Sequence, residues 1–168
     1  MKGNTKKIAV TALIAAVYAV LTISLGFMSY SNIQFRVAEI MILLAFIDKD
    51  YIPGLTLGCF LANILGVYGI QDTIFGTLAT FISACLVYQT GKQLGKSTMS
   101  LIIASLWPAV VNALIIGWML NKFVGLPLIL SMAQVGIGEF VVITIAGIPL
   151  FKAVEGKYGI LVKNAFNS

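Results

Sequence analysis

Long apolar runs separated by short polar stretches divide the chain into six segments. The pattern predicts helices over residues 8–26, 35–47, 52–67, 73–90, 99–120 and 126–154. A helix that crosses the hydrocarbon core of a bilayer needs roughly 20 apolar residues. Backbone groups in lipid must also find their partners within the protein. We therefore predict an all-α integral membrane protein with six transmembrane helices, in which residues 1–168 form a single transmembrane domain.

The composition agrees with this class of protein. The chain is 60% hydrophobic and only 10% charged, and its mean hydropathy is +1.01, whereas soluble domains carry about 25% charged residues. There is no histidine, and Cys59 and Cys85 lie inside apolar runs without a CxxC spacing. We expect buried structural thiols, no metal site and no cofactor. No nucleophile motif is recognisable, so we expect no enzymatic activity.

The basic residues are distributed unevenly between the two sides that six helices would define. Nine lie on the side of the termini: Lys2, Lys6, Lys7, Lys49, Lys92, Lys96, Lys152, Lys157 and Lys163. Arg36 and Lys122 lie on the other side. Because cytoplasmic loops carry the excess of Lys and Arg, we predict cytoplasmic termini in the cell membrane. The net charge of +5 then reflects topology, and we expect no nucleic-acid partner.

The stretch GKQLGKST, residues 91–98, looks at first like a phosphate-binding loop. That motif needs four residues between its glycines and a preceding strand. Here three residues separate Gly91 and Gly95, and an apolar helix precedes them. The chain is therefore expected not to hydrolyse ATP itself. Active transport would need ATPases on another chain or an ion gradient.

Two acidic residues fall within apolar segments. Glu39 lies at the outer end of the second segment, and Glu139 lies near the middle of the sixth. A charge at the centre of a membrane helix costs roughly 2.5–3.5 kcal/mol on insertion scales, so each is a candidate for a functional site. Arg36 lies three residues before Glu39 on one helical face, and an internal ion pair is the structural alternative. For Glu139 the alternative is a hydrogen bond to a neighbouring helix.

The second segment is also short, since its uninterrupted apolar part covers only residues 40–47. We expect residues 30–39 to fold over a sheltered cavity that opens outward. Other polar or aromatic candidates to line it are Tyr30, Asn63, Tyr68, Trp107, Asn112 and Gln134. The amides could instead join helices, and the aromatic residues near the outer ends could form an interfacial belt. Together these side chains favour a flat ligand rich in N–H donors.

The stretch IQFRVAEIMILLAFI, residues 33–47, resembles the QFR-[IV]-[SA]-E segment of the QueT family, membrane proteins of queuosine-precursor uptake. QueT proteins are similar to S components, the substrate-binding subunits of energy-coupling factor (ECF) transporters. The resemblance implies an S-component-like bundle with its site in the outer half. It also implies partners, namely one transmembrane coupling subunit and two ATPase subunits.

The first predicted helix carries small residues at spacings of three and four, which allow another helix to approach closely. This stripe could pack inside the protein or face a partner. In S components, small residues of this helix meet the coupling subunit. The resemblance implies that role for Ala12, Ala15, Ala16 and Ala19.

The substrate implied by the resemblance is a 7-deazaguanine, such as 7-aminomethyl-7-deazaguanine or queuine. Glu39 or Glu139 would accept from N1–H and the 2-amino group, and the other would face a cationic aminomethyl group. Gln34, Asn63 and Asn112 are candidates for the remaining edge, and Arg36 holds either Glu39 or the carbonyl oxygen. Two alternatives stay open: an S component for riboflavin, thiamine or biotin, and a stand-alone secondary transporter driven by protons through Glu139.

Overall fold

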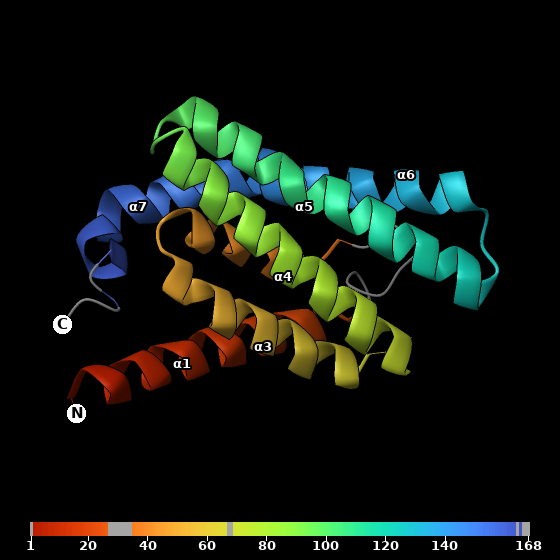
Figure 1. Cartoon of the computed structure of the whole chain (residues 1–168), viewed down its shortest axis with the longest axis horizontal. Helices are drawn as coiled ribbons and strands as arrows, with labels where there is room; N and C mark the ends of the chain where they lie inside the picture. Colours follow the sequence, from red (N-terminus) through yellow and green to blue (C-terminus); the bar gives the residue numbers. More distant parts are fainter. Residues whose placement is uncertain (1, 27–34, 67–68, 164, 166–168) are drawn as a thin grey trace.

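The computed structural model describes residues 2–26, 35–66, 69–163 and 165. These residues are almost entirely helical and contain no strand (Figure 1). The helices are α1 (Lys2–Ser24), the 3₁₀ helices η1 (Val37–Phe46) and η2 (Lys49–Tyr51), α3 (Ile52–Ile64), α4 (Gly69–Gln93), α5 (Thr98–Met119), the π-helix η3 (Leu120–Val124), α6 (Leu128–Glu139), the π-helix η4 (Phe140–Gly147) and α7 (Ile148–Lys163). The prediction of an all-helical protein is therefore confirmed for the described residues.

Four helices are long and apolar enough to cross a membrane: Thr5–Ser24, Gly69–Gln93, Thr98–Val124 and Leu128–Gly159. The other two predicted segments are helical but shorter. The ten residues of η1 span about 20 Å as a 3₁₀ helix, and the thirteen residues of α3 span about 20 Å as an α-helix. Neither matches a hydrocarbon core of about 30 Å by itself. Six full spans therefore remain a prediction.

Successive helical segments run back and forth along the long axis of the molecule (Figure 1). Neighbouring helices touch at four places among others: Gly58 with Tyr18, Asn63 with the Asp72 carbonyl, Thr90 with Trp107, and Ser105 with Thr144. The short helix η1 lies at the centre, where it packs against α1, α3, α4, α5 and η4. Glu39, the polar residue on η1, is buried in the bundle.

One end of the bundle gathers the start of α1 and the end of α7 (Figure 1). Lys7 forms an ion pair of 2.7 Å with Asp50, and the Tyr51 hydroxyl donates to the Val162 carbonyl at 2.7 Å. Lys96 also reaches this end, where it donates to the Phe46 carbonyl. These contacts bring lysines from distant parts of the sequence to the same end, as the predicted topology requires.

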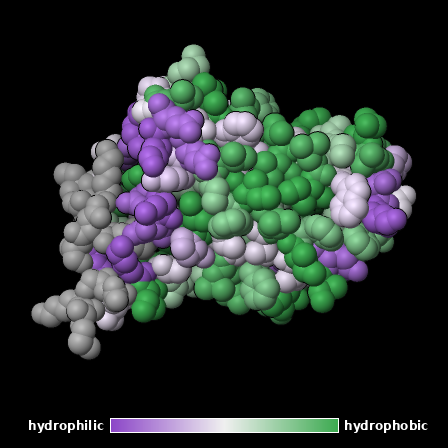
Figure 2. Space-filling view, in the orientation of Figure 1, coloured by the Kyte–Doolittle hydropathy of each residue, from purple (hydrophilic) through white to green (hydrophobic). Residues whose placement is uncertain are grey.

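The surface between the two ends is largely hydrophobic. Figure 2 shows a broad apolar band over the middle of the visible face, with hydrophilic residues concentrated toward the two ends. Large apolar side chains such as Leu13, Leu78 and Ile129 are exposed on the surface. A soluble protein rarely exposes a contiguous apolar surface of this extent, so the band fits contact with lipid.

Candidate functional site

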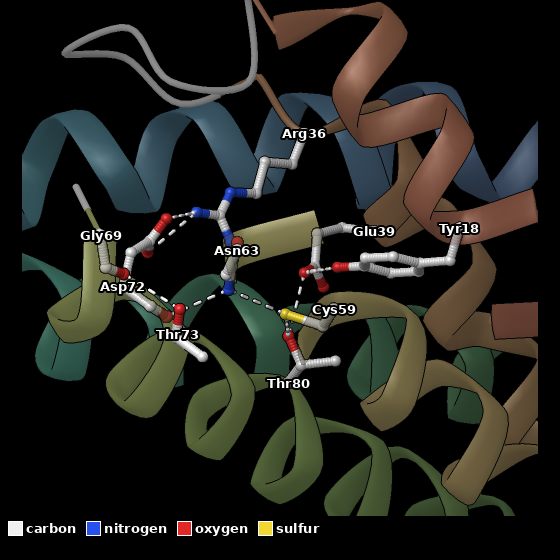
Figure 3. A network of polar contacts seen from close by, with 9 residues as sticks. All are labelled: Tyr18, Arg36, Glu39, Cys59, Asn63, Gly69, Asp72, Thr73 and Thr80. Atoms are coloured by element: carbon white, nitrogen blue, oxygen red, sulfur yellow. Dashed lines mark hydrogen bonds and ion pairs between the residues drawn. The ribbon is translucent and has the colours of Figure 1, made fainter. Parts of the chain in front are cut away.

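Buried polar side chains from four helical elements form a connected cluster in the bundle (Figure 3). We call it the central polar cluster, and its members are Tyr18, Arg36, Glu39, Cys59, Asn63, Asp72 and Thr80. All seven are buried. Polar groups are costly to bury unless they are hydrogen-bonded, so the partners of each atom indicate which groups are satisfied and which are left for a ligand.

Arg36 and Asp72 form the ion pair of this cluster. Arg36 Nη2 donates to Asp72 Oδ1 at 3.0 Å and to Oδ2 at 2.8 Å. Their side chains are 2% and 0% exposed. The sequence offered Glu39 as an alternative partner for Arg36, and the structure shows Arg36 paired across the bundle with Asp72. The helix predicted over residues 73–90 left Asp72 outside it, but α4 begins at Gly69, so Asp72 lies in the first turn of α4 and is buried.

Glu39 is held from two sides through one of its oxygens. Its Oε1 accepts from the Tyr18 hydroxyl on α1 and from Thr80 Oγ1 on α4, the latter at 3.1 Å. Its Oε2 is buried and has no hydrogen-bond partner. Tyr18 and Thr80 thus fix the orientation of the carboxylate and leave one oxygen available. Sequence reasoning missed both residues, because each lies in an apolar run.

Asn63 links Asp72 to Cys59. Its Nδ2 donates to the Asp72 carbonyl at 3.1 Å and contacts Cys59 Sγ at 3.2 Å. Its Oδ1 is buried without a partner. Gly76 on α4 makes room for this arrangement, because a Cβ at that position would overlap Asn63 Nδ2 and lie 3.1 Å from Asp72 Oδ1. The glycine is therefore part of how the cluster is built.

Glu139 lies beside the cluster, at the junction where α6 ends and the π-helix η4 begins. Its side chain is 2% exposed, and its Oε2 is buried without a hydrogen-bond partner. The charges of Glu39 and Arg36 both act on it. π-Helical turns are rare and are frequent at functional sites. The structure thus brings the two predicted glutamates, from opposite ends of the sequence, within electrostatic range of each other.

Comparison of the sequence with known proteins assigns the chain to a family. The family model described as QueT transporter matches residues 8–156. The chain belongs to the QueT transporter family. It is 40% identical over 83 residues to the queuosine precursor transporter QueT of Lactococcus lactis subsp. cremoris (strain MG1363), and this alignment covers 48% of each chain. The match therefore spans about half the length of that curated relative. No solved structure matches the chain.

The family assignment confirms the resemblance found in residues 33–47. Combined with the four apolar helices, it makes this QueT family member a multi-pass protein of the cell membrane. Among the described residues, no group of three or more His, Cys, Asp or Glu side chains could hold a metal ion.

The other predicted site residues of this QueT family member are not members of the central polar cluster. Asn112 on α5 is 3% exposed, and its Nδ2 is buried without a partner. Gln134 is half-buried on α6. Trp107 is 36% exposed and donates from Nε1 to Thr90 Oγ1 at 2.9 Å. Thr90 lies about 15 Å along α4 from Thr80, so Trp107 is remote from the cluster. Tyr30, Gln34 and Tyr68 lie outside the described residues.

The small-residue stripe of α1 divides between two faces. Ala15 and Ala19 are 2% and 8% exposed, and Ala15 packs so closely on Gly58 that a Cβ there would lie 2.9 Å from the Ala15 carbonyl oxygen. Ala12 and Ala16 are exposed. Ala15 therefore serves the contact between α1 and α3 and Ala19 is buried, whereas Ala12 and Ala16 face outward.

Proposed function

We propose that this QueT family member is the substrate-binding S component of an ATP-driven ECF uptake transporter for a queuosine precursor of the 7-deazaguanine class. The family and the name of the Lactococcus lactis relative support the substrate. The observation that carries the proposal is a set of buried polar atoms without partners: Glu39 Oε2, Asn63 Oδ1, Asn112 Nδ2 and Glu139 Oε2. A buried unsatisfied polar atom costs about 1–3 kcal/mol, so a ligand that satisfies these atoms would be bound tightly.

The kinds of atom in this set suit a 7-deazaguanine. Three are oxygen acceptors and one is an amide donor. A 7-deazaguanine ring presents N–H donors at N1, at the 2-amino group and at N9, and a carbonyl oxygen that accepts. In this proposal the glutamates and Asn63 accept from the ring and its substituent, and Asn112 donates to the carbonyl.

The proposed topology has six membrane passes, with η1 and α3 as the two short ones. The end that carries Lys7, Lys96 and Lys152 is the cytoplasmic end. ATP would be hydrolysed by two partner ATPases, since residues 91–98 lack the spacing of a phosphate-binding loop. The outward face of α1 at Ala12 and Ala16 is the proposed contact with the coupling subunit. The loaded subunit would dock there and tilt to release its substrate inward.

Calorimetry on the purified full-length chain in detergent tests this proposal. The compounds are 7-aminomethyl-7-deazaguanine, queuine, guanine, riboflavin and thiamine. We expect 1:1 binding of a 7-deazaguanine, weakened at least about 10-fold in Glu39→Gln and in Glu139→Gln because each removes a charged acceptor. Glu155→Gln on α7 is the matched control and should bind as the unchanged protein does.

The other outcomes separate the alternatives. Binding of riboflavin or thiamine instead would keep the S component and replace the substrate. If none of the compounds binds, and the lone chain takes up substrate into vesicles that contain no ATPases, a proton-driven transporter would be favoured. Unchanged affinity in both glutamine variants would refute the assignment of the site.

A further inference from the structure

An open apolar groove runs between α3 and α4 on the surface of the bundle. It consists of two hollows, with volumes of about 400 and 430 Å³, that share the lining residues Thr56, Phe60, Thr77 and Phe81. We call it the α3–α4 groove. From Thr73 to Phe81 it follows α4 for about 12 Å. This length is close to the thickness of one leaflet, half of a hydrocarbon core of about 30 Å.

A third hollow, with a volume of about 380 Å³, adjoins this groove where α4 ends. Ile52 lines both the third hollow and the nearer part of the groove, so the two are continuous. We call the third hollow the polar mouth, because its lining beyond Ile52 and Cys85 consists of Tyr88, Gln89, Lys92 and Gln93. The α3–α4 groove therefore passes from an apolar part into a polar one.

The polar mouth carries one positive charge, and none of the residues that line it is acidic. Lys92 is exposed and forms no ion pair or hydrogen bond with the side chain of another described residue. The side chains of Tyr88, Gln89 and Gln93 likewise make no hydrogen bond within the described part of the chain. An ammonium, two amides and a phenol hydroxyl can all donate hydrogen bonds. The mouth thus offers an anion a counter-charge and several donors that the protein does not itself use.

We propose that this surface binds an anionic phospholipid, with the phosphate of its headgroup in the polar mouth and one acyl chain in the α3–α4 groove. Basic pockets beside membrane helices suit anionic headgroups. A free phosphate would leave the apolar groove uncovered, and a lipid without net charge would leave Lys92 without a counter-ion. No member of the central polar cluster lines the groove or the mouth. The proposal is therefore independent of what that cluster binds.

Native mass spectrometry of the purified full-length chain in detergent tests the proposal with three ligands. Dioleoylphosphatidylglycerol is anionic, dioleoylphosphatidylcholine has the same chains without net charge, and glycerol 3-phosphate has no chains. We expect the anionic lipid to bind about 5-fold more tightly than the phosphatidylcholine, the factor that one lysine near an anionic headgroup contributes. Glycerol 3-phosphate should not bind at the same concentrations, because it buries no apolar surface.

Cys85 provides a probe of where the lipid binds. It is half-buried in the wall of the polar mouth, whereas Cys59 is 0% exposed in the core. A maleimide should therefore modify Cys85 and leave Cys59 unmodified. Bound phosphatidylglycerol should slow the modification of Cys85, and the same concentration of phosphatidylcholine should slow it less. Peptide mapping of the modified chain measures both cysteines together.

Variants separate the two parts of the site. The ratio of the two dissociation constants should fall toward one in Lys92→Gln and should stay unchanged in the matched control Lys157→Gln, on α7. Both lysines are exposed, so neither change should impair folding. Phe81→Ala removes a wall of the apolar groove and should weaken both lipids alike, without changing their ratio.

Three results would overturn the proposal. Equal affinity for the two lipids, or a preference that survives in Lys92→Gln, would show that the polar mouth does not select the headgroup. Binding of glycerol 3-phosphate as tight as that of phosphatidylglycerol would make the mouth a site for free phosphate compounds. If no lipid protects Cys85 from the maleimide, the groove is not a lipid site, and its face is left for a protein partner.

Discussion

Arg36 and Asp72 are separated by 36 residues, yet two hydrogen bonds of 2.8 and 3.0 Å join their buried side chains. The pair connects the residue that precedes η1 to the first turn of α4. An acid in the first turn of a helix is also favoured by the partial positive charge of the helix N-terminus. The pair therefore anchors the segment that carries Glu39, and it takes up the buried arginine charge.

Replacing Asp72 by Asn should destabilise the protein by about 3–5 kcal/mol, because it leaves the buried guanidinium without its countercharge. Thermal unfolding of the purified chain in one detergent measures the change. Asp50→Asn is the matched control, since Asp50 forms an exposed ion pair with Lys7, and exposed pairs contribute about 0–1 kcal/mol. Equal losses of stability in the two variants would contradict the central role of the Arg36–Asp72 pair.

Replacing Tyr18 by Phe should weaken ligand binding about 10-fold, because the hydroxyl that orients Glu39 is lost. Calorimetry with 7-aminomethyl-7-deazaguanine measures this effect. In the control Tyr51→Phe, the lost hydroxyl donates to the Val162 carbonyl at the opposite end of the bundle. Its affinity should not change. A Tyr18→Phe protein that binds normally would show that Glu39 needs no positioning by α1.

Replacing Gly76 by Ala should destabilise the protein by about 1–3 kcal/mol, as overpacking of a filled core does. The added methyl group would overlap Asn63 Nδ2 and crowd Asp72, so ligand affinity should fall as well. Gly156→Ala in α7 provides the contrast, since nothing lies within 4 Å of its added Cβ. That change should be neutral or should stabilise the helix by up to about 1 kcal/mol. Unfolding midpoints and calorimetry distinguish the two variants.

Replacing Trp107 by Phe should leave ligand affinity unchanged and cost about 1 kcal/mol of stability, the net value of the lost hydrogen bond to Thr90. Calorimetry and thermal unfolding measure the two effects separately. A large loss of affinity would return Trp107 to the binding site, for which it was a candidate from the sequence.

The long helices were predictable because their apolar runs match the thickness of a bilayer. Glu39 and Glu139 were identifiable for the same reason, since a charge inside such a run needs an explanation. The pattern could not show that η1 winds as a 3₁₀ helix, because nearly every residue of Val37–Phe46 is apolar. In such a segment the sequence cannot distinguish a 3₁₀ helix, with 3.0 residues per turn, from an α-helix, with 3.6 residues per turn.

The partners within the cluster were not predictable from spacing along the chain. Arg36 has an acid three residues away in Glu39, but its salt bridge is with Asp72 on another helix. The apolar run that defines α4 starts after Asp72, although the helix begins before it. Tyr18 and Thr80 carry hydroxyls within apolar surroundings, and only the packing of α1 and α4 around η1 turns both toward one carboxylate.

The shortness of α3 has a consequence for the surrounding lipid. Its thirteen residues extend over about 20 Å, and Leu57, Phe60 and Leu61 expose their apolar side chains on its outer face. A bilayer core of about 30 Å meets such a short apolar surface by thinning locally. In the proposed six-pass topology, the membrane would therefore be thinner along that flank. The tilting step proposed for the loaded subunit would then deform the bilayer least on that flank, because the lipid there is already thin.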